Sequence, residues 1–345
     1  MTTPQNGDRR PAPGSNCPGK STISRRALLA GAGTAAAGVG ALAWYGSDEA
    51  GWRADTLIAK APQYDQSLVS RIARGLKELG IGPSQVRGKR VLLKPNLVEP
   101  SREAPHINTH PLFVRAVAEV FLTLDAAQVT VGEGQGHIRD SWYVLEQSGL
   151  ETVLDESRLS FVDLNHDRVF VAKNAGHRMK DRFLYLPQTL RDADWIVSLP
   201  KMKTHHWVGA TLSMKNLFGV MPGICYGWPK NVLHYNGISK SIHDINATVR
   251  PHLAIVDGIV GMDGDGPIMG NPRPAGVIVM GTNLPAVDAT CCRLMDIDPW
   301  RIPYLRMSSA RLGPVFQRHI TQRGEAIADC RTRFRLLPES GLLPR

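Results

Sequence analysis

The chain has 345 residues, of which 43% are hydrophobic and 21% charged, and its length allows one large or two medium domains. The formal net charge is +10, but no block of Lys and Arg with interleaved aromatic residues occurs, which argues against a nucleic-acid-binding protein. The five cysteines show no C-x-x-C spacing, so the sequence carries no signature of a zinc ribbon or an iron–sulfur cluster.

An export signal and leader are predicted over residues 1–46. Arg25-Arg26 precedes residues 27–47, which carry no charge and are rich in alanine and glycine. A stable membrane span needs about 20 predominantly apolar residues, and low hydrophobicity behind an arginine pair favours a twin-arginine signal peptide instead. The twin-arginine translocase is therefore the predicted partner, and the expected location is periplasmic or otherwise extracytoplasmic. Two alternatives are an uncleaved signal that anchors the chain to the membrane and a disordered leader.

Helices and strands alternate along the rest of the chain. Apolar residues three or four apart predict helices at 61–80, 109–124, 142–154, 238–249, 284–295 and 303–312. Short apolar runs predict strands at 89–93, 128–131, 161–164, 169–171, 183–186, 195–199, 253–257 and 276–280. This order indicates an α/β fold, a mostly parallel sheet flanked by helices, with two α/β lobes and a cleft between them as the alternative. We place the α/β domain at 60–312 and a C-terminal extension at 313–345.

Polar side chains follow the predicted strands at the point where each strand ends. In a parallel sheet the carboxyl ends of the strands meet at one edge, where ligands bind. We therefore expect these side chains to build one site. They are Lys94 and Asn96 after the first strand, Glu133 after the second, Lys201, Lys203 and His205 after the strand at 195–199, then Asp257 and Asn283.

The stretch 195–243 carries charge of one sign. It holds five lysines and four histidines but no Asp or Glu. Charges without an internal counter-ion are balanced either by acids from elsewhere in the fold or by an anionic ligand. A solvated basic face is the alternative interpretation, but apolar residues are interleaved with the lysines. The stretch therefore predicts a site for a small anionic ligand.

Each residue of this expected site has a predicted role. The catalytic candidates are His205, Lys203 and Lys215, with the imidazole as a general acid or base, or as a metal ligand. The ligand-binding candidates are Lys94, Asn96, Lys201, Asn216 and Asn283. The cofactor is unknown, with a divalent metal as one option, for which Asp257 and Glu133 are the candidate ligands. Asp257 could instead pair with a lysine, and Glu133 could act as a base.

Ordered motifs across residues 60–312 resemble the family called domain of unknown function 362. They include VLLKPNLV at 91–98, LPKMKTH at 199–205, MKNLFG at 214–219 and GTNLPAVDA at 281–289. The resemblance implies little about activity, because that family has no settled one. Many of its members carry a ferredoxin-like cysteine module, which this sequence lacks. Electron transfer through an iron–sulfur cluster of its own is therefore not expected.

A shorter run is similar to the lactate racemase family, which uses a nickel-pincer nucleotide. The shared pattern is His205, Lys215 and then Pro222-Gly223. It implies that His205 and Lys215 lie near a nucleotide-derived cofactor.

Together these patterns predict an exported α/β protein with an anion- or cofactor-binding cleft. The expected function is that of a metal- or cofactor-dependent enzyme acting on a small carboxylate or phosphate compound. A ligand-binding or cofactor-delivery protein without turnover is the first alternative. A lactate-racemase-like isomerase is the second.

Overall fold

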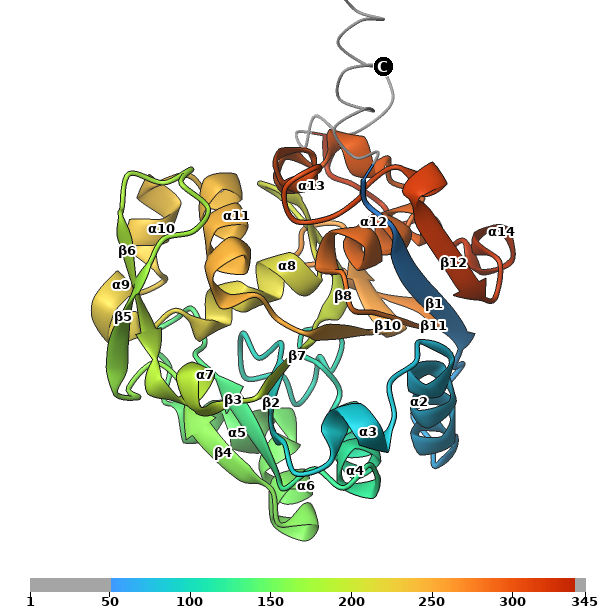
Figure 1. The fold of residues 1–345 in the computed structure, drawn as a ribbon, viewed down its shortest axis with the longest axis horizontal. Helices are drawn as coiled ribbons and strands as arrows, with labels where there is room; N and C mark the ends of the chain where they lie inside the picture. Colours follow the sequence, from blue (N-terminus) through green and yellow to red (C-terminus); the bar gives the residue numbers. More distant parts are fainter. Residues whose placement is uncertain (1–50, 339–345) are drawn as a thin grey trace, which may run out of the picture. The chain divides into compact units, whose positions relative to one another are not determined.

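A ten-stranded sheet is the centre of the structure, a computed structural model that describes residues 51–338 (Figure 1). Its strands follow the order β12-β1-β11-β10-β7-β2-β3-β4, and β8 and β9 extend it from β10. Neighbours from β10 to β4 run parallel, as do β10 with β8 and β1 with β12, whereas β11 is antiparallel to β1 and β10, and β9 to β8. The strands are β1 (Ala54–Lys60), β2 (Arg90–Pro95), β3 (Gln128–Glu133), β4 (Ser160–Asp163), β7 (Trp195–Leu199), β8 (Lys201–His205), β9 (Gly209–Thr211), β10 (Leu253–Asp263), β11 (Asn271–Gly281) and β12 (Ile320–Gly324).

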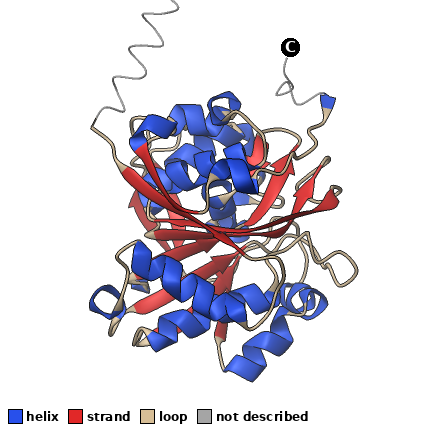
Figure 2. Ribbon diagram, turned by 90° about the vertical axis from the view of Figure 1, so that its right-hand side faces the viewer, coloured by secondary structure: helices blue, strands red, loops and turns tan. Residues whose placement is uncertain are grey.

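Helices cover both faces of this sheet (Figure 2), which confirms the predicted α/β class with a mostly parallel sheet flanked by helices. A separate two-stranded sheet is formed by β5 (Val169–Lys173) and β6 (Phe183–Pro187). The α-helices are α2 (Ser67–Glu78), α3 (Pro83–Val86), α4 (Pro111–Thr123), α5 (Ser141–Ser148), α6 (Leu150–Ser157), α7 (Gln188–Asp192), α8 (Ser213–Asn216), α9 (Gly223–Tyr226), α10 (Asn231–Tyr235), α11 (Ile238–Val249), α12 (Leu284–Leu294), α13 (Pro303–Ser308) and α14 (Ile327–Cys330). The 3-10 helices are η1 (Leu217–Val220), η2 (Pro299–Arg301) and η3 (Gln317–His319).

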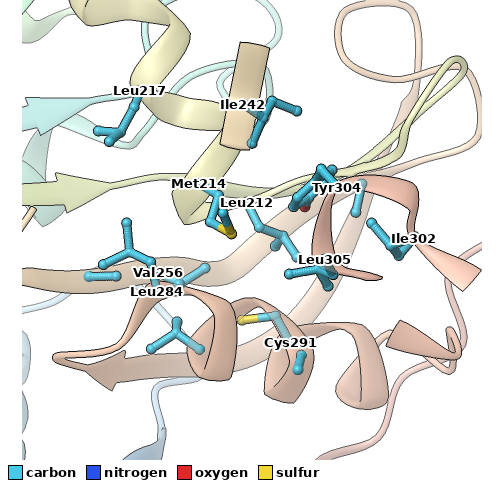
Figure 3. Packing of buried hydrophobic residues seen from close by; sticks show 14 of the residues in the cluster. Leu212, Met214, Leu217, Ile242, Val256, Leu284, Cys291, Ile302, Tyr304 and Leu305 are labelled. Carbon is cyan, nitrogen blue, oxygen red and sulfur yellow. The ribbon is translucent and has the colours of Figure 1, made fainter. Parts of the chain in front are cut away.

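The sheet separates two hydrophobic clusters, one on each face. Successive side chains of a strand point to opposite faces. In β2, accordingly, Leu92 belongs to one cluster and its neighbour Leu93 to the other, and in β10 the same holds for Val256 and Ile255. Strands that are apolar on both sides are typical of parallel sheets covered by helices. The cluster around Val256 also contains Cys291, which is fully buried (Figure 3).

The folded unit extends past both limits of the predicted domain. β1 begins at Ala54, before residue 60, and β12 lies in the segment predicted as a C-terminal extension. The two strands pair in parallel, with Ala54 opposite Ile320. The described residues thus belong to one compact unit, and its ten-stranded sheet runs through the unit instead of dividing into two lobes.

The predicted export signal lies outside the described residues. Between residues 51 and 338, the structure has no helix with the length and apolar character that crossing a membrane requires. The expected location therefore stays a prediction.

Candidate anion-binding site

A cavity of about 700 Å³, called the main cavity below, opens where β2 and β3 end, beside β8, α8, η1 and α10. Its position at the carboxyl ends of parallel strands is the one expected for a ligand site in an α/β fold. Six of the predicted site residues line it: Lys94, Asn96, Glu133, His205, Lys215 and Asn216. The other four, which are Lys201, Lys203, Asp257 and Asn283, do not.

Side chains of β8 point alternately to its two faces, and this alternation determines the surroundings of its three predicted site residues. Lys201, Lys203 and His205 are two residues apart, so they point to one face of the strand, and all three are buried. They lie at successive positions along the strand. Lys201 is nearest to the sheet interior, and His205 reaches the main cavity. The sequence predicts only that these residues follow the strand at 195–199, and in the structure they form a further strand of the sheet.

Lys201 is neutralised by Asp257 in a fully buried ion pair. Lys201 Nζ lies 2.6 Å from Asp257 Oδ2, and Tyr64 donates its hydroxyl proton to Asp257 Oδ1 at 2.9 Å. The backbone N–H of His110 donates to Oδ2 at 3.1 Å. Burial lowers the pKa of Lys201, and the charge of Asp257 opposes this shift. Of the two roles left open for Asp257, partner of a lysine is therefore the one the structure shows.

Lys203 binds two loops that border the main cavity, but it does not line the cavity itself. Its Nζ donates to the carbonyl oxygens of Ile107 at 2.8 Å and Pro267 at 3.1 Å. Burial, with the charges of Lys201 and Lys215, lowers its pKa well below the usual value. Lys203 thus positions the walls of the cavity and does not reach a ligand from this conformation, in contrast to its predicted catalytic role.

A second buried ion pair, Lys94 with Glu133, forms the floor of the main cavity. Lys94 Nζ lies 2.7 Å from Glu133 Oε2 and also donates to the carbonyl oxygen of Pro95 at 2.7 Å. The N–H groups of Leu97 and Gly134 donate to the two carboxylate oxygens, each at 2.9 Å. Glu133 therefore already has one charged partner and two backbone donors.

Gly219 is needed where the chain crosses this pair. A Cβ atom at this position would collide with Glu133 Oε1 and with Lys94 Nζ. Asn216, from the preceding turn, donates from Nδ2 to the carbonyl oxygen of Lys94 at 2.8 Å and to Ser198 Oγ at 3.1 Å. The segment 216–219 is thus fitted closely onto the end of β2.

Lys215 enters the main cavity from the short helix α8. The N–H groups of Ser213 and Met214 donate to the buried Asp288 at 2.8 and 3.1 Å, a favourable arrangement for a carboxylate at a helix N-terminus. Met214 and Leu217 point into the hydrophobic cluster (Figure 3), and both are fully buried. This anchoring fixes the helix so that Lys215 faces the cavity.

The ammonium of Lys215 has no carboxylate partner among residues 51–338. Its Nζ lies 3.9 Å from the centre of the Phe218 ring, a cation–π contact. Burial and the nearby charge of Lys94 lower the pKa of Lys215 to about 8, although Glu133 opposes the shift. Lys215 is the strongest candidate for binding an anion in the main cavity.

Lys230 is a second lysine of the main cavity that lacks an acid, and the predicted site residues did not include it. Its Nζ donates to Asn165 Oδ1 at 2.5 Å and to the carbonyl oxygen of Met221. Burial lowers its pKa to about 7. The signal that could have identified Lys230 is its place in the acid-free stretch 195–243. That signal alone does not tell which lysines of the stretch reach the cavity, because Lys201 of the same stretch pairs with Asp257.

His205 is held as a neutral imidazole. Its Nδ1 accepts the backbone N–H of Trp207 at 3.1 Å, so in the neutral ring the proton resides on Nε2. Burial, followed by the charge of Lys215, lowers the pKa of His205 well below its usual value. The ring is therefore a hydrogen-bond donor through Nε2, rather than the acid or base with a near-neutral pKa that the sequence predicts.

Two buried polar atoms beside these groups have no hydrogen-bond partner in the described part of the chain. They are Asn96 Oδ1 and Thr211 Oγ1, and both residues line the main cavity. Buried polar atoms are nearly always paired, so unpaired ones at a cavity wall point to a ligand or water. Asn96 is a predicted ligand-binding residue, whereas Thr211 carries no sequence signal.

The acidic groups at the rim of the main cavity, Glu99 and Asp265, lie beside basic side chains of the rim rather than beside Lys215 or Lys230. Glu99 contacts His137 and lies 3.2 Å from Arg139 Nε. Asp265 lies 3.4 Å from His206 Nδ1. The unbalanced positive charge therefore lies inside the cavity rather than at its edge.

The donor set does not fit a divalent metal. Between residues 51 and 338 no three His, Cys, Asp or Glu side chains are grouped so that they could hold one ion. Glu133 and Asp257, the predicted ligands, belong to separate ion pairs with Lys94 and Lys201.

Asn283 has a structural role away from the main cavity. Its Oδ1 accepts the N–H of Ala286 at 3.1 Å and caps α12, and its Nδ2 donates to the carbonyl oxygen of Leu312 at 2.9 Å. It lines a second cavity, which shares no lining residue with the first. The expectation that all strand-end polar residues meet at one site is therefore wrong for Asn283.

Comparison with known proteins gives the chain a family but no activity. The thylakoid-associated protein sll1697 of Synechocystis sp. is 28% identical over 250 residues, which are 72% of this chain and 75% of that protein. The lactate racemase apoprotein from Thermoanaerobacterium thermosaccharolyticum is similar in structure with a TM-score of 0.39 at 14% identity, over 63% of this chain. The chain spans about half (52%) of that structure, and a likeness this low carries no argument about activity. Residues 91–293 match the family "Domain of unknown function (DUF362)", to which this chain therefore belongs.

Proposed function

We propose that the main cavity binds a small organic anion, a carboxylate or phosphate compound. The observation that carries this proposal is the pair of lysines, Lys215 and Lys230, which face the cavity without an acidic partner among the described residues. Taking a charge out of water is costly unless an opposite charge compensates it. A bound anion supplies that compensation, whereas Lys94 and Lys201 already have theirs.

The remaining polar groups indicate further features of the ligand. His205 Nε2 is a donor and can share the anionic group with Lys215. Asn96 Oδ1 is a buried acceptor without a donor, which a hydroxyl or amino group on the ligand would satisfy, and the Thr211 hydroxyl can donate or accept. The cavity volume of about 700 Å³ lies in the range of about 300–1,000 Å³ that small-molecule sites occupy. A hydroxy acid, an amino acid or a sugar phosphate meets these requirements.

Isothermal titration calorimetry against a panel of anions tests the proposal. The panel contains inorganic phosphate, glycerol 3-phosphate, lactate, malate and glutamate, and the wild-type chain is compared with Lys215→Met and Lys240→Met. Lys240 is an exposed lysine of the same acid-free stretch and is the matched control. We expect at least one anion to bind the wild type and Lys240→Met equally and Lys215→Met much more weakly. Equal affinity in all three proteins would reject the main cavity as the site.

A proton-transfer enzyme is the second candidate, and the pKa of Lys215 is the observation that favours it. With a pKa of about 8, roughly a tenth of the molecules carry a neutral amine at pH 7, so Lys215 can accept a proton from a bound acid. His205 Nε2–H can stabilise negative charge on the ligand at the same time. Lactate is included among the substrates tested, so the isomerase alternative is covered by the same experiment.

Solvent exchange separates turnover from binding. Each carboxylate of the panel that binds (lactate, malate or glutamate) is incubated with the protein in D₂O, and loss of its Cα–H signal is followed by NMR. For an enzyme we expect exchange that Lys215→Met abolishes and His205→Gln slows. Tight binding with no exchange would favour the ligand-binding or cofactor-delivery alternative. The ultraviolet–visible spectrum of the purified protein shows whether a chromophoric organic anion is the resident ligand.

We also propose that residues 1–46 direct the chain to the twin-arginine translocase. The support is the Arg25-Arg26 pair before the uncharged run. Replacing both arginines with lysine keeps the positive charge. Export that requires the arginine pair itself would then be blocked, whereas export that requires only positive charge would continue. We expect the variant to accumulate in the cytoplasm, as measured by cell fractionation. Unchanged export would overturn this proposal, and a wild-type chain retained in washed membranes would favour the uncleaved anchor.

A further inference from the structure

A second cavity, of about 600 Å³, lies between the C-terminal end of α11 and the N-terminal end of α12. We call it the α11–α12 cavity. His243, Asn246 and Arg250 line it from α11 and its cap, and Arg311 lines it from the segment after α13. None of its lining residues is an Asp or a Glu.

Two arginines give this cavity a positive charge that the described residues do not balance. Arg250 and Arg311 are exposed, and neither forms an ion pair within residues 51–338. Arg250 donates from Nε to the carbonyl oxygen of Ala247 at 3.3 Å, which leaves its terminal NH₂ groups free of that contact. The N-terminus of α12, which carries partial positive charge, is in the same wall. Two guanidinium groups at one cavity are suited to bidentate binding of a carboxylate or phosphate.

Buried polar groups line the deeper part of the α11–α12 cavity. Asn246 is 5% exposed, and its Nδ2 donates to the carbonyl oxygens of Met214 and Ile242 at 3.0 and 2.7 Å. Its Oδ1 is buried without a hydrogen-bond partner in the part of the chain that the structure describes. His243 is 1% exposed, shares Nδ1 with Ser308 Oγ at 3.1 Å, and has a pKa that burial lowers to about 4, so it is neutral at pH 7. Asn246 Oδ1 and the guanidinium groups of Arg250 and Arg311 together suit a ligand that carries a hydrogen-bond donor next to its negative charge.

We propose that the α11–α12 cavity is a second ligand site, separate from the main cavity, for a small anion that carries a hydroxyl group. The carboxylate or phosphate binds Arg250 and Arg311, and the hydroxyl donates to Asn246 Oδ1. This site does not depend on the function proposed for the main cavity, because the two share no residue.

The test uses the arginines, because replacing Asn246 would also remove its hydrogen bond to Met214, next to Lys215. Calorimetry with glycerol 3-phosphate, inorganic phosphate and malate is carried out on the wild type, Arg250→Gln/Arg311→Gln and Lys215→Met. The matched control is Arg74→Gln/Arg306→Gln, which removes two exposed arginines that line neither cavity. Glycerol 3-phosphate adds a hydroxyl to phosphate, and malate tests whether a carboxylate serves instead.

We expect a binding event that Arg250→Gln/Arg311→Gln weakens at least tenfold and that Lys215→Met and the control retain. Glycerol 3-phosphate or malate should bind at this site more tightly than inorganic phosphate. If the main cavity also binds the probe, the wild type shows two sites, of which Arg250→Gln/Arg311→Gln loses one and Lys215→Met the other. If the main cavity does not bind the probe, the wild type shows a single site, and only the arginine variant loses it. The proposal is overturned if the arginine variant binds as the control does, or if none of the three probes binds at millimolar concentration.

Discussion

Replacement of Lys215 by Met should weaken anion binding and stabilise the fold at the same time. A hydrogen bond to a charged group contributes about 1.5–3 kcal/mol. Since every 1.4 kcal/mol changes a dissociation constant tenfold, the variant should bind the anion about 10- to 100-fold more weakly. In the unliganded protein the same ammonium group lowers the free energy of unfolding, because burial lowers its pKa from 10.5 to about 8.

The size of that cost follows from the pKa. A shift of this size corresponds to about 3 kcal/mol at 1.36 kcal/mol per unit. This is an upper limit, because Lys215 keeps an intermediate exposure to solvent. Met removes the cation–π contact with Phe218, worth about 0.5–2 kcal/mol, and replaces part of it with a sulfur–aromatic contact. We therefore expect Lys215→Met to raise the free energy of unfolding by about 1 kcal/mol at pH 7.

The pH dependence of this stability difference is its distinguishing feature. Because the folded-state pKa is depressed, the folded wild type binds fewer protons than the unfolded chain between pH 8 and 10.5, so its stability rises with pH over that window. The advantage of Lys215→Met should be full below about pH 8 and shrink above it, as measured by urea unfolding at several pH values. Lys240→Met should show neither effect. A Lys215→Met protein that is less stable than wild type at pH 7, or that binds the anion normally, would refute the reasoning.

Three further substitutions test predicted site residues that already have partners within the fold. Lys94→Met should lower the free energy of unfolding in urea by about 3–5 kcal/mol, because Glu133 then stays buried without its counter-charge; an unchanged midpoint would contradict this. Asp257→Asn should destabilise by a similar amount, because Lys201 loses its partner, and a chelator should not change the wild-type midpoint; a chelator effect that Asp257→Asn removes would indicate a metal after all. Asn283→Ala should cost about 1 kcal/mol as the loss of a helix cap and leave anion affinity in the main cavity unchanged; reduced affinity there would place Asn283 back in the site.

The fold class was predictable because its signals are local. Apolar runs such as Trp195–Leu199, alternating with amphipathic helices such as Ile238–Val249, determine a parallel sheet with helices on both faces. The two ends of the unit were not predictable in the same way. β12 has only one partner, β1, more than 250 residues earlier in the chain, and no local pattern in Ile320–Gly324 reveals that pairing.

The general position of the site was also predictable, but the roles of its residues were not. The rule that polar residues following parallel strands meet at one edge of the sheet correctly predicts that one cavity is lined by Lys94, Asn96, Glu133 and His205. The role of each lysine, however, depends on which acid the folded chain places beside it. Parallel strand pairing places Lys201 against Asp257 and Lys94 against Glu133, whereas Lys215 forms an ion pair with neither acid.

Anion affinity in the main cavity should fall in two steps as the pH rises from 6 to 9. The side-chain amines of Lys230 and Lys215 attract the anion only when they are protonated. Burial lowers the pKa of Lys230 to about 7 and that of Lys215 to about 8. Affinity should therefore be full near pH 6, fall first through about 7 and then through about 8, although a bound anion shifts both steps upward by stabilising the charged forms. His205 contributes no step in this range, because its pKa lies well below 6.5. A carboxylate ligand is used in the titration, because its own pKa is well below 6, and Lys215→Met should retain only the lower step. Affinity that stays constant between pH 6 and 9 would mean that neither lysine binds the ligand as an ammonium ion.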